Sequence, residues 1–164
     1  MARTVDNLMK MFTSGSESNI RYMAFAEAAD KEGHPNAAKI FRAVATAKMF
    51  HALSHFRATK CTDTTAENLK QALEEETYDF KNAYPPMVQD AVNDDALEAR
   101  HSLEYGMSIG PVITKLISKA IGNSDADESG SYYVCPVCGN IEFGQAPAKC
   151  PFCGVDASDF VSVS

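Results

Sequence analysis

The residues best suited to chemistry are four cysteines near the C-terminus, arranged as two Cys-x-x-Cys pairs. They lie in "CPVCG", which begins at Cys135, and in "CPFCG", which begins at Cys150, with eleven residues between Cys138 and Cys150. Four thiolates that converge from two such pairs form a tetrahedral site, which suits iron or zinc. The spacing predicts a metal site made by Cys135, Cys138, Cys150 and Cys153, and the ligand chemistry leaves iron and zinc open.

The surroundings of these cysteines predict a small module. Paired cysteines in a reducing cytosol indicate metal ligation more often than disulfides. The fifth cysteine, Cys61, lies far from the pairs and is expected to be an inert thiol at a helix end. Aromatic side chains would limit water access to the sulfurs, although any very small domain needs such a core: Tyr132, Tyr133, Phe143, Phe152 and Phe160.

The segment "GNSDADESGSY", from Gly122 to Tyr132, is acidic, rich in small residues and without hydrophobic periodicity. Such a composition is typical of a flexible linker. We therefore predict three parts: a helical region over residues 1–122, a linker over residues 123–131 and a metal-binding module over residues 132–164.

The region before the linker predicts a four-helix bundle, so the fold class is mainly α. Apolar residues recur with a helical period in four segments, separated by turn signals such as "EGHPN" and by a capping box at Thr64 and Glu67. The sequence "AYPP" is expected to stop the third helix, which leaves a proline-broken stretch over Pro86–Asn93. The predicted helices are Thr4–Lys31, Asn36–Lys60, Thr65–Ala83 and Asp94–Ile121.

Charge excludes several partners. The chain carries a net charge of −7 and lacks the excess of lysine and arginine that phosphate backbones or anionic lipids require. No nucleic-acid partner and no membrane association are therefore expected. The N-terminal "MARTVDNLMK" has no apolar signal core, so we expect a cytoplasmic protein.

Polar residues occur on the helix faces that should line the bundle. Heptad spacing places Lys48 and His51 on the inner face of the second helix, and Glu76 and Asp79 on that of the third. The inner stripe of the fourth helix, which includes Gly110, offers no ligand. The ammonium group of Lys48, on the inner face of the second helix, needs an anion nearby, because an unpaired ion in a low-dielectric core is costly.

A helical region followed by a short linker and a CPxCG…CPxCG module resembles the rubrerythrins and their relative nigerythrin. The segments "RYMAFAEAADKEGH", "IFRAVATAKMFHA", "NLKQALEEETYDFKNAYP" and "SLEYGMSIGPVITKLISKA" are each similar to a rubrerythrin segment. The resemblance implies a ferritin-like bundle whose di-iron site reduces peroxide in oxidative stress, fed by a rubredoxin-like Fe(Cys)4 centre. It also implies a homodimer that brings one subunit's module near the partner's bundle.

The family's di-iron ligands are largely replaced in this chain. The family pattern is a Glu on the first helix, Glu-x-x-His on the second, two Glu three residues apart on the third, and Glu-x-x-His on the fourth. Only His51 and Glu76 match it, and Asp79 is one methylene shorter than the family's residue. The positions that correspond to the pattern are Gly15, Lys48, His51, Glu76, Asp79, Gly110 and Ile113.

Two other segments imitate lost ligands. Glu17 lies nearly opposite Gly15 on the first helix. It could replace the family's first glutamate as a metal ligand only if that helix were shifted in register. The sequence from Glu98 to His101 has the Glu-x-x-His spacing but lies three turns too early. We instead expect Lys48 to replace the missing cation, in a cluster with Glu76 and Asp79 to which a protonated His51 could add.

Three functions remain open from the sequence. The first is an electron-transfer protein with one Fe(Cys)4 centre and a bundle that has lost its di-iron site. The second is a peroxide reductase with a rearranged bundle site that uses His51, Glu76 and Asp79. The third is a zinc-binding scaffold without redox chemistry. The first two need a redox partner protein, either a reductase or an acceptor.

Overall fold

The computed structural model describes residues 2–122 and 130–164. The chain divides into two compact units, residues 1–63 and residues 64–164, and each is described by itself. Most of the predicted linker, residues 123–129, lies outside the described residues. The predicted division at residue 122 therefore stays a prediction.

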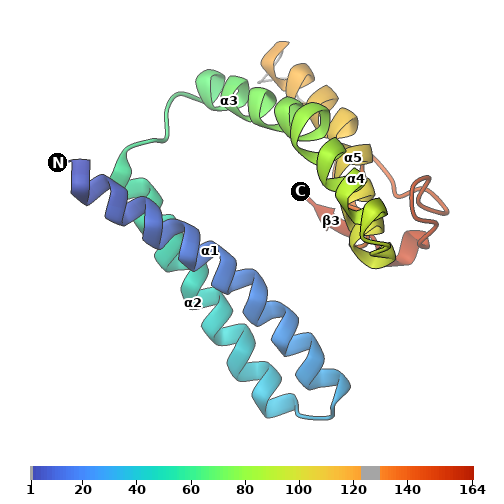
Figure 1. The fold of residues 1–164 in the computed structure, drawn as a ribbon, viewed down its shortest axis with the longest axis horizontal. Helices are drawn as coiled ribbons and strands as arrows, with labels where there is room; N and C mark the ends of the chain where they lie inside the picture. Colours follow the sequence, from blue (N-terminus) through green and yellow to red (C-terminus); the bar gives the residue numbers. More distant parts are fainter. Residues whose placement is uncertain (1, 123–129) are drawn as a thin grey trace. The chain divides into compact units, whose positions relative to one another are not determined.

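The first unit is a helical hairpin. Helices α1 (Ala2–Lys31) and α2 (Pro35–Thr59) lie side by side along their length (Figure 1). The turn between them uses Gly33 at φ 79°, and the His34 N–H donates to the Ala29 carbonyl oxygen at 2.8 Å. Pro35 begins α2, where its missing N–H leaves no helical hydrogen bond unmade.

Small residues form the seam of this hairpin. The buried α2 residues are Ala38, Ala45 and Ala52, spaced seven apart. A Cβ added at Gly15 of α1 would lie 3.2 Å from the Ala52 Cβ, so small side chains let the two helices approach closely. The Asn19 side-chain amide donates to the Ala45 carbonyl oxygen at 2.8 Å, which fixes the register of the two helices.

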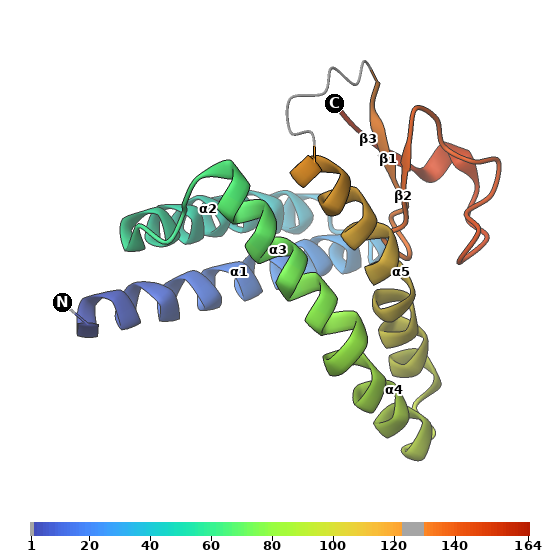
Figure 2. The same cartoon turned by 90° about the horizontal axis from the view of Figure 1, so that it is seen from above.

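The second unit begins with a continuous helical segment that packs against one long helix. Helices α3 (Thr65–Tyr78) and α4 (Tyr84–Asn93) are joined by the π-helical turn η1 (Asp79–Ala83), and both pack against α5 (Leu97–Gly122) (Figure 2). The predicted cap is present, since the Glu67 N–H donates to Thr64 Oγ1 at 3.3 Å. No described helix is long and apolar enough to cross a membrane.

The prediction that "AYPP" stops the third helix is wrong. The chain stays helical through η1 into α4, so the predicted interruption over Pro86–Asn93 is itself helix. The two prolines fall in the first turn of α4, where a missing N–H costs little. The Tyr84 N–H bonds five residues back to the Asp79 carbonyl oxygen, the spacing of a π-helix. The last helix begins at Leu97 rather than Asp94, because Asp95 turns the chain at φ 52°.

The module is a small antiparallel sheet that carries the two cysteine pairs. Strand β1 (Tyr132–Val134) lies between β2 (Ile141–Phe143) and β3 (Val161–Val163), with a short 3₁₀ turn, η2 (Ala157–Asp159), before β3. The rings of Tyr132 and Phe143, which are paired across β1 and β2, lie 5.1 Å apart. The predicted fold class, a mainly α protein with a ferritin-like bundle and a rubredoxin-like module, is confirmed.

Candidate metal centre

The four paired cysteines converge. The ligand atoms of Cys135, Cys138, Cys150 and Cys153 all lie within 4.8 Å of one another. Two sulfur pairs, Cys135 with Cys153 and Cys138 with Cys150, are each 3.4 Å apart. Sulfurs that bind one metal at about 2.3 Å in a tetrahedron lie at such separations, so the residues fit a metal ion.

Each cysteine pair sits in a tight turn built the same way. The Cys135 N–H donates to the Asn140 carbonyl oxygen and the Cys150 N–H to that of Val155, both at 2.8 Å. Gly139 and Gly154, which follow the second cysteine of each pair, have φ of 78° and 79°. Glycine adopts a left-handed φ without the steric strain that other residues have there, which explains why a glycine ends each CPxCG sequence.

Backbone N–H groups stabilise thiolates in this site. Burial opposes ionisation of Cys150, but the N–H groups of Cys153 and Phe152 donate to its sulfur and lower its pKa to about 7. Burial raises the pKa of Cys138, against a single opposing N–H from Asn140. The thiols of the site therefore differ in how readily they ionise, and a bound metal cation would favour the thiolate form of all four.

Helix α5 covers the cysteines from within the same unit. Ile109 is 2 % exposed and forms one buried cluster with Cys135, Cys138 and Cys150. Tyr105, Val112 and Ile113 of the same helix pack around this cluster. The sequence did not reveal this contact, because the heptad pattern of α5 concerned only the helix face expected to line the bundle.

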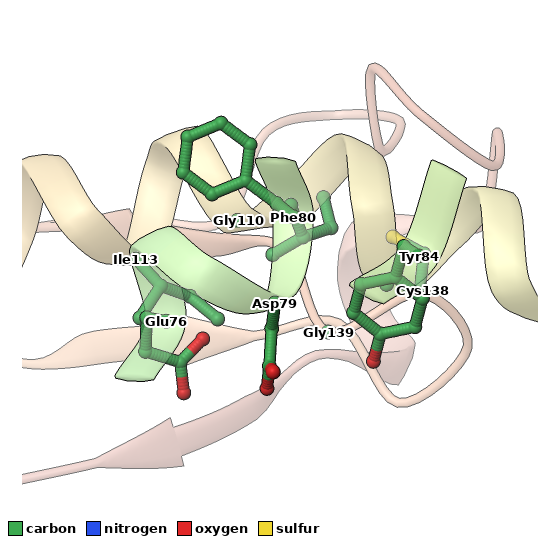
Figure 3. A pocket seen from close by; sticks show the side chains of 10 residues that line it. Glu76, Asp79, Phe80, Tyr84, Gly110, Ile113, Cys138 and Gly139 are labelled. Atoms are coloured by element: carbon green, nitrogen blue, oxygen red, sulfur yellow. The ribbon is translucent and has the colours of Figure 1, made fainter. Parts of the chain in front are cut away.

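A cavity of about 240 Å³ lies beside Cys138 within the second unit (Figure 3). Glu76 of α3 and Asp79 of η1 line it, and the two side chains project on the same side of their helix. Cys138 and Gly139 contribute the module's part of the lining. Two of the predicted bundle residues thus lie near the cysteine site.

The two carboxyl groups repel one another. Partial burial, then the charges of Asp79 and Glu75, raise the pKa of Glu76. A nearby cation would oppose these effects and stabilise the charged form of Glu76.

Aromatic rings fill the space beside two glycines of α5. A Cβ added at Gly110 would overlap the Phe80 side chain, lying 2.7 Å from its Cγ. One turn earlier, a Cβ at Gly106 would lie 2.6 Å from the Tyr84 hydroxyl oxygen. Phe80 and Tyr84 are four residues apart, as are the two glycines, so this spacing is the sequence signal for the contact.

The other predicted bundle residues lie in the first unit or on exposed positions. Gly15 is buried in the α1–α2 seam, Lys48 is half-buried and His51 is exposed. Glu17 is exposed and lies 3.9 Å from Arg21 in an ion pair. Since Glu76 and Asp79 belong to the other unit, the proposed cluster with Lys48 stays a prediction.

The Glu-x-x-His sequence from Glu98 to His101 lies in the first turns of α5, and both of these residues are exposed. In the part of the chain that the structure describes, the four cysteines are the only group of three or more potential ligands whose donor atoms converge. Rearranged sites that recruit Glu17, Glu98 or His101 therefore gain no support from this geometry.

Comparison with known families gives two matches. Residues 6–107 match the family described as rubrerythrin, and residues 133–161 match the rubrerythrin, rubredoxin-like domain. The two matches together include both units and all four cysteines.

Curated relatives match along most of their length. Rubrerythrin-2 of Clostridium acetobutylicum is 26 % identical over 176 residues, which covers 97 % of this chain and 96 % of the relative. Nigerythrin of Nitratidesulfovibrio vulgaris is 24 % identical, covering 92 % of this chain and 81 % of that protein. A solved structure of mixed-valence nigerythrin has a TM-score of 0.58 at 23 % identity, with coverage of 98 % and 86 %, a likeness of fold.

Proposed function

The chain belongs to the rubrerythrin family, and we propose that it is an iron redox protein that transfers single electrons through its four-cysteine centre, with helices that have lost the family's di-iron site. The observation that carries this proposal is the contrast between the two candidate sites. Four sulfurs converge in the module, whereas Phe80 fills the space beside Gly110 where the family has a ligand.

The cysteine site is suited to iron. Iron bound by four thiolates supplies a one-electron ferric/ferrous couple. The residues of this chain hold the sulfurs at fixed separations, donate N–H groups to Cys150, and exclude water through the packing of Ile109. A site that changes little between redox states favours rapid electron transfer.

An exposed apolar surface beside the site supports a redox partner protein. Val137 and Phe152, the third residue of each Cys-Pro-x-Cys turn, are 55 % and 42 % exposed. Each is flanked by two ligand cysteines, so a protein docked there would come close to the metal. We expect the partner to be a reductase or an acceptor, and the homodimer and cytoplasmic location remain proposals of the same kind.

The test is the metal content and redox behaviour of the purified protein. We expect about one metal per chain, and a reversible one-electron couple when that metal is iron. Replacing Cys150 with Ser should abolish the visible colour. A finding of three irons per chain would contradict the loss of the di-iron site, and colourless zinc protein from iron-replete cells would favour the non-redox scaffold.

A peroxide reductase with a rearranged site is the second candidate, because Glu76 and Asp79 still line a cavity near Cys138. Peroxide turnover should be absent or very slow compared with an intact di-iron relative, since Gly110 and Ile113 supply neither a bridging carboxylate nor an imidazole. Rapid turnover that Glu76→Ala and His51→Ala abolish would establish this second candidate instead.

A further inference from the structure

The contact between Ile109 and the cysteines joins a bundle helix to the metal centre. Ile109 is almost completely buried, and three of the four ligand cysteines share its cluster. These cysteines are themselves 1 %, 7 % and 3 % exposed, for Cys135, Cys138 and Cys150. One wall around the sulfurs is therefore made by α5 rather than by the module.

Water exclusion has a definite electrostatic sign at such a site. Four thiolates around ferric iron carry a net charge of −1, and around ferrous iron a net charge of −2. Water stabilises the doubly charged state more than the singly charged state, because solvation energy grows with the square of the charge. Removing water from the sulfurs therefore disfavours reduction and lowers the redox potential.

We propose that Ile109 is a positioning residue of the four-cysteine centre, which holds water away from the sulfurs and so sets the redox potential and the metal retention of the module from helix α5. The inference rests on the proposed electron-transfer function, but its physical core, the shielding of the sulfurs, does not depend on the identity of the metal.

Other residues also pack around the cluster of Ile109 and the cysteines, but none of those on α5 is as deeply buried as Ile109. Tyr105, Val112 and Ile113 pack at the edge of the cluster but remain partly exposed. Val155 and Phe160 pack against it from the module side. Ile109 is the α5 residue in the buried cluster itself, so shortening it opens the wall directly over the sulfurs.

The test compares three substitutions at Ile109 with one matched control. Ile109→Ala shortens the side chain most, Ile109→Val removes one methyl group and stays branched and apolar, and Ile109→Thr has the shape of Val with a hydroxyl in place of one methyl group. The control is Ile117→Ala, the same truncation on the same helix, at a half-buried residue that lines a separate groove by the sheet.

Two measurements are made on each variant. In the iron protein, Ile109→Ala and Ile109→Thr should favour the reduced form about tenfold, which raises the midpoint potential by about 59 mV for one electron. In the zinc protein, both should lose metal to a chelator about tenfold faster. Ile109→Val and Ile117→Ala should match the original protein in both measurements.

The outcomes separate this inference from the proposed function. If the iron protein shows no reversible couple, the electron-transfer function fails, while the zinc-release measurement still tests the shielding. If a reversible couple exists but Ile109→Thr and Ile109→Ala leave both potential and zinc release at control values, the role of Ile109 is overturned. Thermal unfolding identifies any variant that fails to fold, and the comparison of Ile109→Thr with Ile109→Val, which have the same shape, keeps the test decisive.

Discussion

At the scale of single residues, each cysteine turn depends on the glycine that follows its second cysteine. A CPxCG turn needs a glycine at positive φ, and both Gly139 and Gly154 have it. Local turn chemistry therefore brings together the two sulfurs of each pair, and the fold of the module brings the two pairs together. The cover provided by Ile109 could not be predicted in this way, because it depends on which face of α5 meets the module.

The uneven environment of the thiols gives a first prediction. In the metal-free protein, a thiolate should form near pH 7 at Cys150, because burial there is outweighed by the N–H groups of Cys153 and Phe152 together with the thiols of Cys138 and Cys153. Because this pKa is depressed on folding, the associated stability is present above the unfolded pKa and is lost as pH falls through about 7. Thiolate ultraviolet absorbance measured against pH should show this step.

The control for that titration is Cys150→Ser, which should remove the step near pH 7 and leave those at higher pH. Cys138, whose pKa burial raises, is expected among the last to ionise. A titration in which Cys150→Ser leaves the first step unchanged would assign that step to another thiol.

A second residue-scale prediction concerns Gly110. Gly110→Ala should destabilise the protein by about 1–3 kcal/mol or more, because the added methyl group overlaps the Phe80 side chain and α5 must shift. Gly122→Ala on the same helix is the control, since a Cβ there meets nothing within 4 Å. Denaturant unfolding of both variants measures the difference, and equal stabilities would mean that Phe80 moves away freely.

At the scale of elements, helix existence was predictable and helix ends were less so. The turns at "EGHPN" and Thr64 contain glycine, proline or a capping hydroxyl and lie where the sequence indicated. The prediction that the double proline after Tyr84 ends a helix is wrong, because proline breaks a helix interior but suits a first turn. The π-helical turn η1, which places Asp79 and Phe80 ahead of those prolines, has no simple sequence signal.

The alanine seam of the first unit gives an element-scale prediction. Ala45→Leu should destabilise the α1–α2 hairpin by about 1–3 kcal/mol, because three added carbons have no space between the helices. Ala47→Leu, two residues along on an exposed position, should change stability little. Thermal unfolding followed by circular dichroism compares them, and equal stabilities would place the seam on another face of α2.

At the scale of the whole molecule, the positions that the family resemblance assigns to di-iron ligands are divided between the two units. The first unit contributes Gly15, Lys48 and His51, and the second contributes Glu76, Asp79 and Gly110. Within the second unit, Glu76 has a raised pKa from burial and neighbouring carboxyl groups. A cation near these carboxyl groups would lower that pKa, so we expect a positively charged substitute for the metal near them.

We predict that Lys48 is that substitute, forming a hydrogen-bonded cluster with Glu76 and Asp79. Lys48→Met should then leave two close carboxylates without a cation and destabilise the protein by about 3 kcal/mol near neutral pH. Lys39→Met, on an exposed position of the same helix, is the matched control and should have little effect. The measurement is the free energy of unfolding at several pH values.

The sign of the pH dependence distinguishes this cluster from a solvent-exposed lysine. In Lys48→Met, at least one carboxyl group should have a folded-state pKa above its unfolded value, so the folded state binds its proton more tightly. The deficit in stability is then largest near neutral pH and shrinks as pH falls through that raised pKa. An added divalent metal should also rescue the variant, since it would restore a cation between the carboxylates. If Lys48→Met instead unfolds at the original temperature at neutral and mildly acidic pH without added metal, Lys48 is a surface residue and its charge has not replaced a metal.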